Sequence, residues 1–159
     1  MRLMFYNAYI LPHFDYCCSI WGNCCHYLLD TLLKLQKRAA RIILDEHDFM
    51  KPSVELFEKS GIVPITKRIQ YHQSLMMFKV KHDLAPEYVS SLVLPAHTNQ
   101  RYETRFSSSK NFILPKHNTE LYKTSFSYSG PKIWNSLPDT VKMSTCLSEF
   151  KQLYKSLLF

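Results

Sequence analysis

Five cysteines are the residues of this chain best suited to hold a metal, and four of them lie close together near the N-terminus. Cys17 and Cys18 are adjacent in the chain, as are Cys24 and Cys25, and His26 follows directly. Structural zinc sites usually take their ligands in pairs spaced by roughly two to four residues, whereas adjacent side chains tend to diverge. We therefore interpret these thiols as small buried or reducible side chains and expect no metal and no cofactor, with zinc as the alternative.

Catalytic side chains form no recognisable constellation in the sequence. The seven histidines are scattered, and no serine lies in a Gly-x-Ser-x-Gly sequence. The 13 carboxylates include no Asp-Asp pair and no Asp-x-Asp sequence that could hold two magnesium ions. The three glycines are far apart, which excludes a glycine-rich phosphate loop. We therefore expect no catalytic residues and no enzymatic activity from this chain on its own.

A long amphipathic helix is predicted from Leu28 to Leu44. Its apolar residues recur at steps of three and four, which places them on one face of an α-helix: Leu28, Leu32, Leu35, Ala39 and Ile42. Four cations fall on the other side, with no acidic residue between them: Lys34, Lys37, Arg38 and Arg41. This cationic face is either an ordinary solvated surface or a surface that contacts phosphates.

Charge and composition narrow the class of partner. The net charge is +7 and the pI about 9.2, a surplus that favours polyanions, nucleic acid before an anionic membrane. The 159 residues suffice for one domain with a real core, and the 46% hydrophobic content argues against disorder. No apolar run reaches the roughly 20 residues of a membrane span. The irregularly spaced cysteines indicate a reducing compartment, so we expect an intracellular protein of the nucleus or cytoplasm.

The fold is predicted to be mainly α-helical, with a few short β segments in the C-terminal third. Periodicity and capping residues predict further helices over 1–11 (ended by Pro12), 53–57 (with Gly61 past its end), 65–82, 87–93 and 145–158. Short strands are predicted at 112–114 and 125–129, the second from its alternation of serine and aromatic residues.

Composition changes near residue 95, so we divide the chain into a helical region, 1–94, and a region of loops and short strands ending in a helix, 95–159. We expect the two to pack as one domain, with Trp134, Phe150 and Tyr154 folding the tail back onto the helices. In the second region cations alternate with rings, as in Arg101-Tyr102 and Arg105-Phe106. That pattern is typical of a basic loop or, alternatively, of single-strand binding.

Several sequence blocks together resemble a known family over nearly the whole chain. They are Leu-Gln-Lys-Arg-Ala-Ala-Arg-Ile-Ile (35–43), the series Tyr6, Pro12, Tyr16 and Trp21-Gly22, Gly-Ile-Val-Pro-Ile (61–65) followed by Arg68, and Ser-Phe-Ser-Tyr-Ser-Gly-Pro-Lys-Ile-Trp-Asn-Ser-Leu-Pro (125–138) with Phe150-Lys151 downstream. The last block is the most specific. The chain resembles the C-terminal part of the reverse transcriptase polyprotein of LINE-type, jockey-like non-LTR retrotransposons.

This resemblance implies a helical thumb-like region and the segment beyond it, without the fingers and the palm that carry the polymerase aspartates. The thumb of such an RNA-directed DNA polymerase grips the template–primer duplex. The cationic face of 28–44 then becomes a candidate contact to an RNA/DNA duplex or a single strand, together with Lys67 and Arg68. The implied partners are nucleic acid and the missing palm and fingers of a longer polymerase. The role of the Trp134–Pro138 block stays unassigned.

An alternative function is a non-catalytic protein-interaction module, left over or domesticated from a retroelement. The N-terminal residues look like half of an interface whose other half is absent: Leu3, Phe5, Tyr6, Tyr9 and Ile10. Exposed apolar patches of several hundred Å² promote association. We therefore expect self-association through this N-terminal apolar face.

Overall fold

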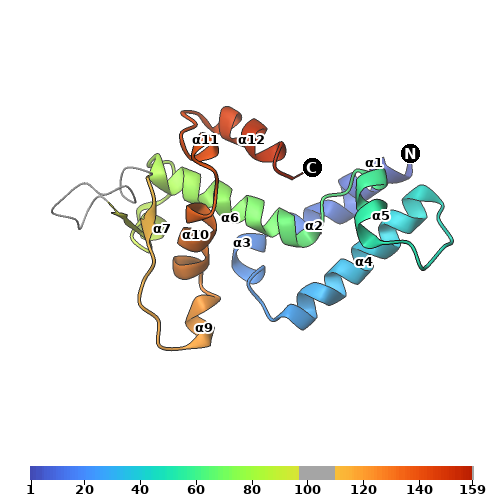
Figure 1. The fold of residues 1–159 in the computed structure, drawn as a ribbon, viewed down its shortest axis with the longest axis horizontal. Coiled ribbons are helices and arrows are strands. Elements are labelled where there is room, and N and C mark those ends of the chain that lie inside the picture. Colours follow the sequence, from blue (N-terminus) through green and yellow to red (C-terminus); the bar gives the residue numbers. More distant parts are fainter. Residues whose placement is uncertain (97–109, 159) are drawn as a thin grey trace. The chain divides into compact units, whose positions relative to one another are not determined.

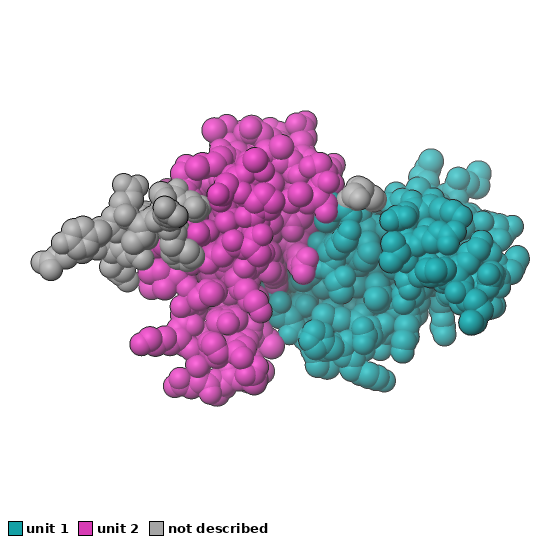
Figure 2. Space-filling view, in the orientation of Figure 1, with its two compact units in different colours: residues 1–69, 158–159 teal, residues 70–157 magenta. Residues whose placement is uncertain are grey.

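A computed structural model of the protein describes residues 1–96 and 110–158, and this part of the chain is mainly helical with two short strands (Figure 1). The expected mainly α fold with few β segments is confirmed. The chain forms two compact units, unit 1 with residues 1–69 and Leu158, and unit 2 with residues 70–157 (Figure 2). The predicted division of one domain between residues 94 and 95 stays a prediction. The Arg101-Tyr102 and Arg105-Phe106 pairs lie outside the described residues.

Unit 1 is built from the N-terminal helices. They are α1 (Arg2–Phe5), the π-helical η1 (Tyr6–Ile10), α2 (Leu11–Asp15), α3 (Cys18–Trp21), α4 (His26–Leu44), α5 (Ser53–Ser60) and the first residues of α6 (Ile65–Lys81). The helices predicted over 28–44, from Ser53 and from Ile65 are confirmed. α5 runs on to Ser60, and Gly61 takes the left-handed conformation past its end with φ 69°.

Pro12 does not end the N-terminal helix, contrary to the prediction. The chain stays helical from Arg2 to Asp15, and the Leu11 N–H bonds to the Tyr6 carbonyl, five residues back. This π-type turn lies just before Pro12, and such a local change of hydrogen-bond register lets the helical path continue past a residue that has no N–H. The helical path ends before Cys17, whose φ of 51° is left-handed.

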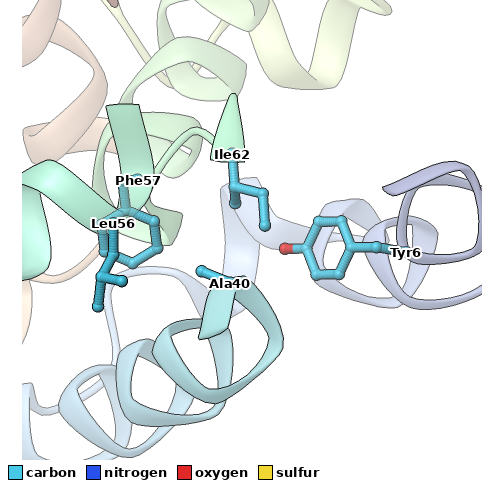
Figure 3. Packing of buried hydrophobic residues seen from close by; sticks show 5 residues of the cluster. All are labelled: Tyr6, Ala40, Leu56, Phe57 and Ile62. Atoms are coloured by element: carbon cyan, nitrogen blue, oxygen red, sulfur yellow. The ribbon is translucent and has the colours of Figure 1, made fainter. Parts of the chain in front are cut away.

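Figure 3 shows the core of unit 1, where Tyr6, Ala40, Leu56, Phe57 and Ile62 are buried together. Ala40 has no exposed surface and presents only a methyl group, which allows α4 and α5 to pack closely. Tyr6 is 3% exposed, so the prediction that it belongs to an exposed N-terminal apolar face is wrong. Its ring fills the core, and its hydroxyl finds a partner on α4.

That partner is Gln36, a fully buried polar residue. Its Oε1 accepts a hydrogen bond from the Ile65 N–H at 2.7 Å, and its Nε2 donates to the Tyr6 hydroxyl at 2.9 Å and to the Val63 carbonyl at 3.4 Å. The Ile65 N–H belongs to the first turn of α6 and has no acceptor within its own helix. Gln36 therefore joins η1, α4 and the start of α6.

The buried face of α4 differs from the predicted one. Leu28, Leu35 and Ile42 are 50%, 48% and 66% exposed. The residues that α4 packs into the two clusters of unit 1 include Leu29, Leu32, Leu33, Ala39, Ala40, Ile43 and Leu44, with Gln36 buried among them. The prediction followed apolar side chains only, whereas a polar residue marks the centre of the buried face.

Unit 2 contains the rest of α6 and the elements after it. They are α7 (Glu87–Ser90), β1 (Leu94–Pro95), β2 (Phe112–Ile113), α9 (Glu120–Lys123), α10 (Phe126–Asn135), α11 (Asp139–Lys142) and α12 (Leu147–Lys155). β1 and β2 pair antiparallel, with Leu94 opposite Ile113 and Pro95 opposite Phe112. The strand predicted at 112–114 is confirmed in shorter form. The helices predicted over 87–93 and 145–158 are also shorter than expected.

Residues 125–129 do not form the predicted strand, because they begin α10. This helix continues through Gly130 and Pro131, two residues that disfavour a helix interior. A Cβ on Gly130 would lie 2.8 Å from the Met77 Sδ of α6, so the glycine lets the two helices approach. Packing with α6 thus overrides the local preference.

Aromatic residues form the core of unit 2. Trp134 and Phe150 have no exposed surface, and their stacked rings have centroids 6.0 Å apart. Phe150 also lies 4.7 Å from the ring of Phe78 on α6, and Ser74 donates a hydrogen bond to the buried Tyr154 hydroxyl at 3.4 Å. The expectation that Trp134, Phe150 and Tyr154 fold the tail onto the helices is confirmed. Along the described residues, no helix combines the length and apolar character needed to cross a bilayer.

Candidate nucleic-acid interface

The four cations predicted to contact phosphates form one continuous row on α4, here called the basic ridge: Lys34, Lys37, Arg38 and Arg41. Successive members are at most three residues apart, so their side chains gather on one side of the helix surface. At about 1.5 Å per residue the ridge is about 10 Å long. That length matches about three phosphates of one strand at about 3.4 Å each.

The ridge is accessible from solvent, and little of its positive charge is neutralised by carboxylates in the described part of the chain. Lys34 and Arg38 are exposed, and Lys37 and Arg41 are half-buried. Within the described residues, none of these four side chains forms an ion pair with a carboxylate. The opposite side of α4 is fixed in the core by Gln36 and Ala40, so the ridge stands on a rigid element.

Phe49 positions Arg41, and sequence reasoning missed this residue. The Arg41 Nη2 donates to the Phe49 carbonyl at 3.2 Å, and the guanidinium lies 5.3 Å from the centroid of the Phe49 ring. A guanidinium over an aromatic face is held by the ring's negative face. The only signal in the sequence is a lone aromatic residue directly after the acidic turn Asp45–Asp48.

Carboxylates bound the ridge at both ends. Asp30 lies one turn before Lys34 on the same side of α4, and Asp45 follows the last turn. Asp45 accepts a hydrogen bond from the Arg2 Nη1 at 2.8 Å, and this bond holds the pKa of Asp45 below its usual value. A hollow of about 460 Å³ opens beside the ridge, lined in part by Arg38, Arg41 and Asp45. The four ridge cations therefore lie between these two carboxylates.

Lys67 and Arg68, the other two predicted contacts, have internal partners in the structure. The Lys67 Nζ donates to the Leu158 carbonyl at 2.7 Å. Arg68 pairs through two nitrogen atoms with the Asp15 carboxylate, and these hydrogen bonds raise the pKa of Arg68. Both side chains of this pair are about one quarter exposed, so the pair fastens α2 to α6. A phosphate contact by Lys67 or Arg68 stays a prediction.

The thiols are free and unevenly exposed. Cys17, Cys25 and Cys146 are exposed, Cys24 is intermediate and Cys18 is buried. Burial raises the pKa of the Cys18 thiol to about 11, which keeps it protonated and unreactive. Among residues 1–96 and 110–158, no three histidine, cysteine or acidic side chains come together in a group that could hold a metal ion.

Comparison of the chain with protein-family models, with curated proteins and with solved structures found no match.

Proposed function

We propose that this chain binds nucleic acid through the basic ridge of α4, as the thumb-like C-terminal portion of a retroelement RNA-directed DNA polymerase that it resembles. In this proposal the ridge contacts the backbone of a template–primer duplex, and the polymerase chemistry belongs to a palm that this sequence does not contain. The observation that carries the proposal is the ridge itself. Four neighbouring cations on a rigid helix have no acidic partner within the described residues.

Contacts of this kind have a measurable signature. Each phosphate that a cation neutralises releases a counterion, so the logarithm of the affinity falls with the logarithm of the salt concentration. The slope is about −0.9 per phosphate on B-form DNA, and it is independent of base sequence. Four ridge contacts therefore account for a slope of up to about three to four.

The test replaces Lys34, Lys37, Arg38 and Arg41 together with glutamine. Gln has nearly the same helix propensity as Lys and Arg, so α4 is expected to stay intact. Binding to a labelled RNA/DNA duplex is followed by fluorescence anisotropy between about 50 mM and about 200 mM salt. We expect the salt slope to flatten by up to about three to four and the affinity to fall regardless of sequence.

A matched control removes four lysines from unit 2 that form no ion pair within the described residues: Lys116, Lys132, Lys151 and Lys155. Both variants lose the same charge, so a specific interface predicts a larger change for the ridge variant. Equal slope changes in the two variants, with unchanged circular dichroism, would show that only diffuse net charge matters. The proposal would then be rejected.

Exposed apolar residues of unit 1 favour a second candidate function, a non-catalytic protein-interaction module. Phe5, Tyr9 and Ile10 are 58%, 68% and 44% exposed, and Ile42 on α4 is 66% exposed. A groove of about 300 Å³ is lined in part by Phe5, Ile10 and Ile42. In solutions of the pure chain, the occupant of this face is a second copy of the chain, which makes the oligomeric state the test.

A further inference from the structure

Unit 2 contains a cationic cavity that is independent of the basic ridge. Its volume is about 500 Å³, and its lining includes Lys81, Lys110 and His82. Pockets that bind small organic ligands have volumes of about 300–1,000 Å³. Asp83 is the one carboxylate among the described residues that line the cavity. The lining is therefore positively charged overall.

Lys81 lines this cavity and is half-buried. Its Nζ donates to the Lys142 carbonyl and lies 5.5 Å from the centroid of the Trp134 ring. Within the described residues no carboxylate forms an ion pair with it. An ammonium carries three N–H donors, and the carbonyl takes one of them. Lys81 thus keeps donor capacity for a ligand.

The surroundings of Lys81 are held in place by buried hydrogen bonds. The Lys142 Nζ, in a residue only 3% exposed, donates to Asn111 Oδ1 and to the Asn135 carbonyl, each at 3.0 Å. Lys110 has a left-handed φ of 53°, and its carbonyl accepts a hydrogen bond from the Trp134 Nε1 at 3.0 Å. Non-glycine residues in this conformation are strained and cluster at ligand sites.

Electrostatics favour an anion in this cavity. Burial, followed by the charge of Lys110, lowers the pKa of Lys81 to about 8. Burial and the charges of Lys81 and Lys110 also lower the pKa of His82. The C-terminal end of α6 opposes an anion, with a partial charge of about −0.5. However, the Leu84 N–H already satisfies the Lys79 carbonyl at that end, at 2.8 Å. An incoming anion would supply a counter-ion to Lys81 and Lys110.

We propose that the cavity around Lys81 and Lys110 binds a phosphate monoester, carried either by a small organic molecule or by the 5′ end of a nucleic acid. A monoester carries about −1.5 to −2 charge near neutral pH, more than the single charge of an internal phosphodiester. Lys81 and Lys110 line the cavity with Asp83 as the one described carboxylate, so the lining is cationic and a more highly charged anion is favoured over a singly charged one. Nothing in this site depends on the basic ridge.

The test measures binding of inorganic phosphate to the full chain by calorimetry. Lys81→Met keeps the length of the side chain and removes its charge, and Lys155→Met is the matched control in the same unit. Lys110→Met is a second variant, because Lys110 is exposed and its loss leaves the aromatic core intact. We expect Lys81→Met and Lys110→Met each to weaken phosphate binding by about tenfold or more, as when a charge-assisted hydrogen bond is lost. Lys155→Met should bind like the wild type.

The same measurement at several pH values gives a second readout. The charged and titratable groups that line the cavity with Lys81 are Lys110, His82 and Asp83. Lys81 also contacts the carbonyl of Lys142, whose ammonium lies 3.7 Å from the Asp139 carboxylate. Of the groups lining the cavity, Lys81 titrates near pH 8, so phosphate affinity should fall as the pH rises through about 8. This fall should be absent in Lys81→Met.

Two oligonucleotides separate the sources of the phosphate. Tighter binding of a 5′-phosphorylated strand than of its 5′-hydroxyl form, dependent on Lys81, assigns the site to a nucleic-acid end. Equal binding of both strands, with Lys81-dependent binding of inorganic phosphate, assigns it to a small phosphorylated molecule. Absence of phosphate binding, or equal binding by wild type and both lysine variants, overturns the proposal. The basic-ridge glutamine variant should bind inorganic phosphate normally, so failure of one proposal is distinguishable from failure of the other.

Discussion

At the scale of single residues, Gln36 is the clearest example of a side chain whose structural role cannot be recognised from the residues around it in the sequence. An amide in an apolar helix pattern looks like an exposed position, yet Gln36 is fully buried. Its orientation is fixed because the Ile65 N–H can only donate, so Oε1 must face Ile65 and Nε2 must face Tyr6. The residue serves structure, and it holds the helix that carries the basic ridge.

Replacing Gln36 with leucine should therefore destabilise unit 1. The change leaves the Ile65 N–H and the Tyr6 hydroxyl buried without partners, at about 1–3 kcal/mol for each group. We expect a loss of about 2–6 kcal/mol in the free energy of unfolding, measured by urea denaturation. Tyr6→Phe removes one hydroxyl only and should cost about 1 kcal/mol. An unchanged urea midpoint for Gln36→Leu would contradict this role.

Lys81 should make stability depend on pH in the alkaline range. Its pKa is about 8 in the folded chain and 10.5 as the ordinary value. Between these values the unfolded chain binds more protons than the folded chain, so stability rises with pH across this window. Below about pH 8 both states are protonated, and the contribution of Lys81 is constant. The wild type should therefore become more stable relative to Lys81→Met as the pH rises from about 8 to about 10. The difference between their free energies of unfolding should increase in favour of the wild type.

The pH dependence of the wild type alone does not isolate Lys81, because Cys18 also contributes in the alkaline range. The wild type must therefore be compared with Lys81→Met. Burial raises the pKa of the Cys18 thiol from 9.0 to about 11, so its contribution to stability falls over that range. The two effects oppose each other in the wild type, and subtraction of the Lys81→Met curve isolates the lysine. A constant difference between wild type and Lys81→Met at all pH values would disprove the assignment.

At the scale of elements, close approach of the backbone decides where glycine is required. Gly22 follows α3 with an ordinary φ of −65°. A Cβ there would lie 2.3 Å from the Cys18 carbonyl oxygen and 2.5 Å from the Ile69 Cγ2. The space, and not the backbone conformation, excludes a side chain at this position.

Gly22→Ala should lower the free energy of unfolding by about 1–3 kcal/mol, the usual cost of overpacking. Gly61 offers a contrast, because a Cβ there would meet no described atom within 4 Å, while its φ is +69°. Asparagine tolerates that conformation, so Gly61→Asn should cost less than Gly22→Asn, where any side chain clashes. Thermal unfolding of these three variants checks both expectations, and a stable Gly22→Ala protein would show that α3 can shift away from α6.

At the scale of the whole molecule, the apolar surface of unit 1 should govern association. Ile10 and Ile42 are 44% and 66% exposed and line one groove. We expect the wild type to form concentration-dependent oligomers and the Ile10→Gln, Ile42→Gln double variant to be monomeric in light scattering. Tyr6 is unsuitable for this test, because its ring is part of the core.

Leu84 and Leu121 provide the control for this prediction, since both are exposed apolar residues of unit 2, at 61% and 80%. Their replacement with glutamine should leave the oligomeric state unchanged. A wild type that stays monomeric at high concentration would remove the interaction-module candidate and leave nucleic-acid binding as the proposed function.

The sequence by itself determined the features that depend on neighbours along the chain. The spacing of leucines predicted α4, Gly61 predicted the end of α5, and the steps between Lys34 and Arg41 placed the basic ridge on one side of a helix. Helix periodicity and capping are local, so a single sequence contains them. The mainly α fold follows from the same local rules.

Tertiary structure alone decided which surfaces are buried and which cations share a site. The buried face of α4 depends on Gln36 meeting Tyr6 and Ile65, about 30 positions away in either direction. α10 is a helix in spite of Gly130 and Pro131 because it packs against Met77 of α6. The cavity of Lys81 and Lys110 likewise joins distant parts of the chain. Contacts between residues far apart in sequence carry no local pattern, and only the folded chain brings them together.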